Sequence, residues 1–233
     1  MQVEIFSDVV CPWCAIGKRR FEAALAEFEH ADQVEVTWRA FELDPGAPPE
    51  REGDLADRLA KKYGMTRQQA LEANRSLTEV AAAEGLAFHF DRARPGNTFD
   101  AHRLLHWAKA EGLQGALKER LLLAYFTEGE PIGERETLVR LAADVGLDAE
   151  AAAEVLESGR YADDVRADEA EAQELGVSGV PFFVVDRRLG IPGAQDKDTV
   201  LRLLERAWER SHPLTVVPAD PAAATCDGES CTL

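Results

Sequence analysis

The stretch QVEIFSDVVCPWCAIGKRRFEAALAEFEH, residues 2–30, decides the fold. Residues 2–9 alternate weakly between apolar and polar side chains, which favours a β-strand. After the CPWC segment, apolar residues recur at the spacing of an amphipathic helix. Residues 34–43, VEVTWRAFEL, alternate again and predict a second strand. Strand, helix and strand in this order form a βαβ unit, which is typically parallel and right-handed.

The pattern changes twice further along the chain. Residues 45–160 begin in a segment rich in proline and glycine and continue as a run of amphipathic helices, several of which end in glycine. Within this run a strand signal is confined to LAFHFD, residues 86–91. The α/β pattern then returns, with a polar helix over 162–176, an apolar strand over 182–185, a return strand within 187–194 and an amphipathic helix over 195–211.

We therefore predict an α/β protein whose sheet is built from the two ends of the chain. One discontinuous domain, residues 1–44 and 161–211, carries a helical insertion domain, residues 45–160. Residues 212–233 are rich in proline and alanine and poor in large apolar side chains, which is typical of a mobile tail.

The composition excludes several classes of protein. With 26 basic and 43 acidic residues, the net charge is −17, which repels phosphate backbones and anionic lipids, so nucleic acid is not expected as a partner. No apolar run approaches the roughly 18 residues needed to cross a bilayer, so we expect no membrane span. The N-terminus lacks the basic head and long apolar stretch of a secretory signal, which predicts a cytoplasmic protein.

Cys11 and Cys14 flank Pro12 and Trp13 where the first strand gives way to the helix. A thiol reacts as its thiolate, and the unpaired N–H groups and positive dipole at the start of a helix favour that anion on Cys11. The spacing brings Cys14 close enough for a disulfide, and Pro12 suits the first helical position. This pattern indicates dithiol–disulfide exchange. The residues alone leave three alternatives: half of a zinc site, two inert small hydrophobes, and a redox site that serves another chemistry.

Gly179-Val180-Pro181 precedes the predicted strand over 182–185. Proline cannot donate a hydrogen bond to the sheet, so Pro181 belongs at the start of the strand. Bonds before proline are usually trans. A cis bond here would turn the Val180 backbone outward, free to pair with an extended peptide or a thiol-bearing substrate.

With CPWC after the first strand, a long helical insertion and GVPFFVV before the last helix, the chain resembles the DsbA-like branch of the thioredoxin superfamily. More narrowly, FSDVVCPWCAIGKRRFE and NTFDAHRLLHWA (97–108) resemble FrnE-type cytosolic disulfide oxidoreductases. The resemblance extends to about residue 210. It implies a thioredoxin-like fold with a large helical insertion, Cys11 as nucleophile, Cys14 as resolving cysteine, and Pro181 as a cis-proline facing them. Trp13 stands where periplasmic DsbA proteins carry histidine, so we expect a less oxidising couple.

The same branch includes glutathione-dependent isomerases and transferases, which usually have serine where this chain has Cys11. A hydroxyl can hold a glutathione thiolate by hydrogen bonding, whereas a cysteine would form a mixed disulfide. Cys11 therefore favours redox exchange, and isomerase or transferase activity is kept as an alternative function.

Cys226 and Cys231 form a second pair near the end of the tail, with Gly228 between them allowing a tight turn. We expect a redox relay in which the tail pair exchanges electrons with Cys11 and Cys14. A structural disulfide and a metal role are alternatives, including one zinc ion held by all four cysteines. Some FrnE-type proteins carry a similar second pair.

Further substrate-binding candidates lie around the cysteines and on the helix that begins near residue 98. They are Pro12, Trp13, Val180, Asn97, Thr98 and His102. His102 and His106 share a helix face, but their context lacks the glutamate of a metalloprotease, so we expect structural or groove-lining roles and no metal. The function predicted is thiol–disulfide exchange without a cofactor. The expected partners are protein or small-molecule thiols and disulfides. A homodimer is a further predicted assembly.

Overall fold

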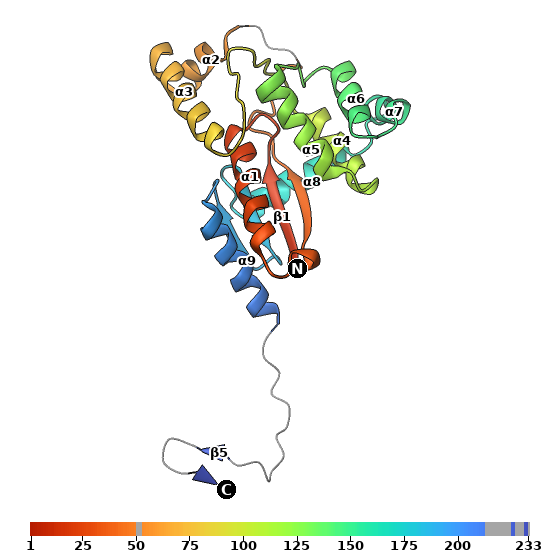
Figure 1. Cartoon of the computed structure of the whole chain (residues 1–233). Coiled ribbons are helices and arrows are strands. Elements are labelled where there is room, and N and C mark those ends of the chain that lie inside the picture. Colours follow the sequence, from red (N-terminus) through yellow and green to blue (C-terminus); the bar gives the residue numbers. More distant parts are fainter. Residues whose placement is uncertain (50–52, 213–224, 227–230, 233) are drawn as a thin grey trace.

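The computed structural model (Figure 1) describes residues 1–49, 53–212, 225–226 and 231–232, the last two pairs by their backbone alone. A four-stranded sheet has the order β2-β1-β3-β4. Its strands are β1 (Gln2–Ser7), β2 (Glu35–Ala40), β3 (Phe182–Val185) and β4 (Leu189–Pro192). β1 and β2 run parallel, and β3 pairs antiparallel with β1 and β4. The βαβ unit, the strand over 182–185 and its return strand are therefore confirmed.

The helices fill the rest of the described chain apart from turns and loops. They are α1 (Pro12–Glu27), α2 (Leu55–Tyr63), α3 (Arg67–Ala83), α4 (Phe99–Ala110), α5 (Gln114–Leu123), α6 (Arg135–Asp144), α7 (Ala149–Ser158), α8 (Ala162–Glu174) and α9 (Lys197–Ser211). Two short helical turns complete the set: the 3₁₀ turn η1 (Ala31–Gln33) lies between α1 and β2, and the π-helical turn η2 (Ala124–Glu128) follows α5. None of these helices has both the length and the apolar character that crossing a bilayer requires.

The sheet buries a different set of side chains on each face. On one face Ile5 and Phe183 pack against Phe21 of α1 and Leu204 of α9. The rings of Phe21 and Phe183 stack with their centres 5.7 Å apart. On the other face Phe6 packs against α8. Because successive side chains of a strand point to opposite faces, β1 is apolar on both sides and forms the middle of a three-layer α/β unit.

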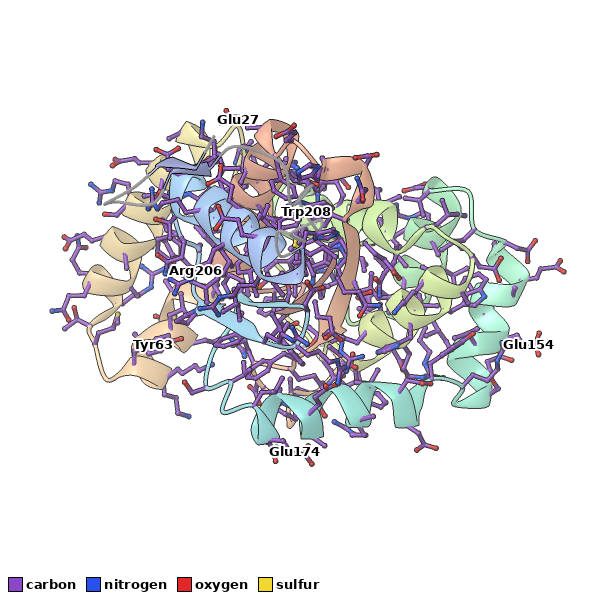
Figure 2. The ribbon with its side chains drawn as sticks, turned by 90° about the horizontal axis from the view of Figure 1, so that it is seen from below. Glu27, Tyr63, Glu154, Glu174, Arg206 and Trp208 are labelled. Atoms are coloured by element: carbon purple, nitrogen blue, oxygen red, sulfur yellow. The ribbon has the colours of Figure 1, made fainter. Side chains whose placement is uncertain are left out.

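The helical insertion divides into two arms. α2 and α3 pack against each other on one side of the α/β unit, and α4 to α7 pack together on the other (Figure 1). Seen from below, Tyr63 at the end of α2 and Glu154 of α7 lie on opposite sides, with Trp208 of α9 between them (Figure 2). The result is a DsbA-like thioredoxin fold with a helical insertion, as the resemblance implies.

The strand predicted over residues 86–91 is wrong. Phe88 and Phe90 alternate as in a strand, but both pack around Phe126, with the Phe88 and Phe126 rings stacked 4.5 Å apart. The amide of His89 donates to the Phe126 carbonyl at 2.7 Å. The hydroxyl of Thr127 in η2 also donates to the Ala87 carbonyl at 2.7 Å. The segment is therefore held against η2 by aromatic packing and these two hydrogen bonds, without a partner strand.

Two glycines allow three connecting segments to meet at one carbonyl group. The Pro49 oxygen lies between Gly96 and Gly133, so a Cβ on Gly96 would fall 2.1 Å from it and one on Gly133 would fall 2.0 Å from it. The amide of Asn97 also donates to the carbonyl of Pro48 at 2.9 Å. The approaches to α2, α4 and α6 are thereby fixed against one another.

We expect Gly96→Ala and Gly133→Ala each to lower the free energy of unfolding by about 1–3 kcal/mol, because the added methyl group forces backbone to move. Urea unfolding measures this change. Gly115→Ala is the matched control: it lies in α5 with no atom within 4 Å of the added Cβ, and should be neutral or stabilising by up to about 1 kcal/mol. Equal effects at Gly96 and Gly115 would contradict the close approach.

Candidate active site

Two free thiols lie where α1 begins. Cys11 is the N-cap residue, with extended backbone at φ −90° and ψ 113°, and Pro12 is the first helical residue. The amide of Cys14 donates to the Cys11 carbonyl at 3.0 Å, which closes one tight turn. Cys11 is 4% exposed and Cys14 is 1% exposed, whereas Trp13 between them is 44% exposed. The predicted position of CPWC, at the change from strand to helix, is confirmed.

The loop before β3 closes over Cys11. The Val180–Pro181 bond is cis, as the resemblance implies. The Cys11 thiol donates to the Val180 carbonyl, with Sγ and oxygen 3.5 Å apart. On α1, a Cβ at Gly17 would lie 3.0 Å from Cγ of Pro181. The missing side chain of Gly17 therefore lets the proline loop pack against the helix that carries the thiols.

A carboxylate lies buried behind the thiols. Asp8 is 0% exposed, and it accepts hydrogen bonds from the amides of Val9 at 2.7 Å and Leu43 at 2.8 Å. Nε2 of His102 lies 3.3 Å from the same carboxylate. Burial tends to raise the pKa of Asp8, but the contacts with His102 and Leu43 outweigh it and hold that pKa below its ordinary value. Asp8 is therefore an anion at neutral pH.

A buried lysine of the insertion acts on Cys14 through its charge. Lys118 of α5 is 1% exposed, and its Nζ lies 5.5 Å from the centre of the Trp38 ring. One turn earlier, the amide of Gln114 accepts from the Trp38 N–H and donates to the Trp38 carbonyl, both at 2.9 Å. Glu119, the next residue, binds Lys18 of α1 at 2.6 Å. These contacts dock α5 between β2 and α1 and point Lys118 inward.

The two thiols titrate as one coupled pair. Burial tends to raise the pKa of Cys14, but the hydrogen bond from Cys11, the charge of Lys118 and the hydroxyl of Ser7 lower it. The hydroxyl of Ser7 is buried and has no other partner in the structure. The bond to Cys14 and burial raise the pKa of Cys11. Cys14 is therefore the more acidic thiol of the pair, and Cys11 is the one that holds its proton more tightly.

This assignment differs from the sequence prediction that the start of the helix makes Cys11 the acidic thiol. Cys11 does begin α1, but its contact with Cys14 and the burial of its sulfur raise the pKa of its thiol.

Asn97 holds the start of α4 in place. Its Nδ2 donates to Glu42 at 3.3 Å, and its Oδ1 accepts from the amide of Phe99 at 2.9 Å. Thr98 is the N-cap residue and 3% exposed, but its side chain makes no capping bond. The side chain of Asn97 therefore does the capping. Contact with substrate stays a prediction for both residues.

His102 and His106 lie one turn apart on α4, but they serve different carboxylates. His102 is 1% exposed and faces Asp8, whereas Nε2 of His106 lies 2.9 Å from Asp168 of α8. Substrate contact by His102 stays a prediction. In the part of the chain that the structure describes, no three His, Cys, Asp or Glu side chains gather as metal ligands.

The tail cysteines are placed by their backbone alone. Cys226 and Cys231 lie opposite each other in the antiparallel pair β5 (Thr225–Cys226) and β6 (Cys231–Thr232). Their side chains lie outside the described residues. The relay, the structural disulfide and the four-cysteine zinc site therefore stay predictions.

Sequence reasoning missed Asp8 and Lys118. Lys118 had a signal, because it falls on the same helix face as the buried Gln114, Leu121 and Leu122, where a lysine needs a reason to be. Asp8 had a weaker signal, a carboxylate just before the apolar pair that leads into CPWC.

A further buried carboxylate, Glu42, follows β2. Its side chain is 0% exposed, and it lies 3.0 Å from the guanidinium of Arg166, which it shares with Glu169. Burial, with the neighbouring Glu169 carboxylate, raises the pKa of Glu42 to about 7. Its charge therefore changes close to neutral pH.

The folded-state pKa of Glu42 lies above its ordinary value of 4.5, so this residue's contribution to stability is present at low pH and is lost as the pH rises to about 7. We expect wild type to lose about 1–2 kcal/mol over that range relative to Glu42→Gln, because ionised Glu42 is buried beside the Glu169 carboxylate while water around this partly exposed cluster weakens the effect. Thermal unfolding across this pH range measures the difference. Glu205→Gln, on the exposed side of α9, is the control. A difference between wild type and Glu42→Gln that does not vary with pH would contradict the assignment.

Known proteins share this fold. Residues 2–205 match the model of the DSBA-like thioredoxin domain. The uncharacterized protein YwbO of Bacillus subtilis is 31% identical over 200 residues, which is 85% of this chain and 92% of YwbO. A probable DsbA oxidoreductase of Streptomyces coelicolor is 45% identical, with a TM-score of 0.87 over 100% of this chain and 99% of that chain. The cytosolic disulfide reductase DsbM of Pseudomonas aeruginosa is 21% identical, with a TM-score of 0.63 over 90% of this chain and 100% of its own. The chain therefore belongs to the DSBA-like thioredoxin domain family.

Proposed function

We propose that this protein is a thiol–disulfide oxidoreductase of the FrnE type that works through Cys11 and Cys14 in the cytoplasm. The observation that carries the proposal is the pair of free, buried thiols at the start of α1, with Cys11 bonded to the Val180 carbonyl beside the cis Pro181. The 45% identity to a probable DsbA oxidoreductase over the whole chain supports the same chemistry.

Cys11 is the sulfur that meets the substrate. It is the more exposed of the two, it follows the loop that ends β1, and it touches the proline loop. In the reducing direction its thiolate attacks one sulfur of a substrate disulfide, forming a mixed disulfide and releasing the first substrate thiol. The Cys14 thiolate then attacks Sγ of Cys11, which releases the second. Two electrons pass from the pair to the substrate, and the reverse sequence oxidises a dithiol.

The surface around the thiols suits an apolar or extended substrate. Trp13 is 44% exposed and Leu43 is 37% exposed, so both present apolar surface to solvent. The amide of Leu43 binds Asp8, so its side chain belongs to the same end of the molecule. We therefore propose proteins or small molecules carrying a disulfide or thiol next to an apolar group as substrates.

Substitution of each cysteine separates their roles. We expect Cys11→Ser to reduce insulin at the uncatalysed rate, because no attacking sulfur remains. Cys14→Ser should also lose turnover but accumulate a mixed disulfide on Cys11, since nothing resolves it. Turbidity follows insulin reduction, and mass spectrometry of the acid-quenched protein identifies the adduct. An adduct on Cys14 in the Cys11→Ser variant, with turnover retained, would contradict this order of attack.

We further propose that Cys226 and Cys231 relay electrons to the front pair. The register of β5 and β6 supports this, because it brings the two residues opposite each other, as an intramolecular disulfide between them requires.

Replacing both tail cysteines by serine should slow the re-oxidation of Cys11 and Cys14 while leaving the first turnover of the reduced protein unchanged. Stopped-flow Trp fluorescence during a single oxidation cycle measures both steps. Ser230→Ala is the control variant, because it changes the tail but keeps both thiols. Re-oxidation at the wild-type rate would rule out the relay, and one bound zinc per purified wild-type chain, lost in the serine variant, would favour the four-cysteine zinc site.

A further inference from the structure

The outer edge of β4 is an open edge of the sheet. In the part of the chain that the structure describes, β4 ends the four-stranded sheet and no further strand pairs with it. The amide of Gly193 donates to the Pro181 carbonyl at 2.8 Å, and bonded positions alternate along an antiparallel pair of strands. Ile191, opposite Phe183, therefore binds β3 through its backbone. The N–H and C=O of Gly190, which is exposed, point away from the sheet.

A groove of about 570 Å³ runs between this edge and α9. Ile191 and Leu203 supply apolar surface to it, and side chains of α9 from Thr199 to Glu209 line the rest. Over that stretch the helix rises by about 15 Å. An extended segment of about four or five residues has the same length. The groove therefore offers the length and the open backbone edge that an added β-strand requires.

Arginine gathers around the groove, although the chain as a whole has a net charge of −17. Two arginines line the groove from α9, one precedes β4, and one lies in the last turn of α9: Arg202, Arg206, Arg188 and Arg210. Glu205 and Glu209 also line it, but no described carboxylate lies within 4 Å of the guanidinium of Arg206, which Figure 2 labels on α9. Unpaired arginine in an acidic molecule favours an acidic occupant.

The tail of this chain has a sequence that matches the groove. Residues 214–217, LTVV, are rich in β-branched side chains and lie between Pro213 and Pro218. The residue before a proline favours extended backbone, and a proline ends a strand because it cannot donate to the ladder. Residues 213–233 contain three acidic residues and no lysine or arginine. The tail therefore combines a strand-forming run of the right length with the charge that the arginines favour.

The tail also begins beside the groove. The ring of His212 stacks on Trp208 with the centres 3.8 Å apart, and its amide donates to the Trp208 carbonyl at 2.9 Å. These contacts fix the end of α9 about one turn beyond Glu209, which lines the groove. A chain that leaves His212 and follows the groove runs towards the end of β4, where Gly193 binds Pro181 of the proline loop.

We propose that residues 214–217 of the tail dock as a fifth strand on the outer edge of β4, exchange hydrogen bonds with the backbone of Gly190 and cover the groove. This docking needs no redox chemistry, but its consequence for the relay rests on the proposed function. From Pro218 to Cys226 the extended chain spans up to about 28 Å. A docked tail therefore brings Cys226 towards the proline loop and raises its effective concentration at Cys11.

Amide exchange of the full-length reduced protein, measured residue by residue by NMR, tests the docking. We expect the Gly190 amide to exchange about tenfold or more slowly in wild type than in Thr215→Pro/Val216→Pro, because the prolines cannot pair with β4. The Ile191 amide, which binds β3, is the internal reference and should not change.

The matched control is Ala222→Pro/Ala223→Pro, which places two prolines in the tail outside the docking segment and should keep the wild-type protection of Gly190. Equal exchange of Gly190 in wild type and in Thr215→Pro/Val216→Pro overturns the docking.

A charge reversal and a dilution series identify the occupant. At low salt, Arg206→Glu should reduce the protection of Gly190 by about threefold, because the acidic tail is then repelled. Arg75→Glu makes the same change of charge at an exposed arginine of α3 and should have no effect. Protection that increases with protein concentration would assign the edge of β4 to a second copy of the chain and overturn docking of the molecule's own tail.

The link to the relay is measured separately. Serine at both Cys226 and Cys231 should leave the protection of Gly190 unchanged, since docking needs no sulfur. Thr215→Pro/Val216→Pro should slow the re-oxidation of Cys11 and Cys14, as the serine variant does. Lost protection with re-oxidation at the wild-type rate would overturn the link to the relay. A protected Gly190 in a protein whose thiols do not exchange with substrates would support the docking and overturn the proposed function alone.

Discussion

The hydrogen bonds that Asp8 accepts hold the reactive end of the molecule together. This carboxylate is buried, accepts hydrogen bonds from the amides of Val9 and Leu43, and faces His102. It therefore joins the ends of β1 and β2 to α4. The same bonds end β1 earlier than its apolar pattern predicts and turn the chain into CPWC. The charge of Asp8 also opposes the ionisation of Cys11, whereas the charge of Lys118 favours the ionisation of Cys14.

The insertion supplies the positive charge that acts on Cys14. α5 binds the backbone of β2 through Gln114 and α1 through Glu119, and it places Lys118 between these contacts. The thioredoxin-like part and the insertion are therefore one chemical unit: the first supplies the sulfurs and the anion, and the second supplies the cation. Loss of the docking contacts would therefore change the pKa of Cys14, even though none of these contacts involves a sulfur.

Local patterns were enough to predict most of the fold and the centre of the site. Strand alternation, helical spacing and the CPWC sequence act over a few residues, so β1, α1, β2 and β3 follow from the sequence, and the resemblance added the cis bond before Pro181. The contacts that set the charge of the thiols are long-range: Asp8 and His102 are 94 residues apart. The false strand at 86–91 has the same origin, since Phe126 lies far along the chain and satisfies the apolar alternation by packing.

The contacts made along the outer edge of β2 have a consequence for behaviour in solution. The side chain of Gln114 forms hydrogen bonds with both backbone groups of Trp38, and the carboxylate of Asp168 accepts a hydrogen bond from the amide of Ala40 at 2.7 Å. These are the groups to which an additional strand would bind, so the sheet is closed on this side against edge-to-edge self-association. A newly made molecule surrounded by its own copies is thereby protected at the edge where a six-residue strand would otherwise favour aggregation.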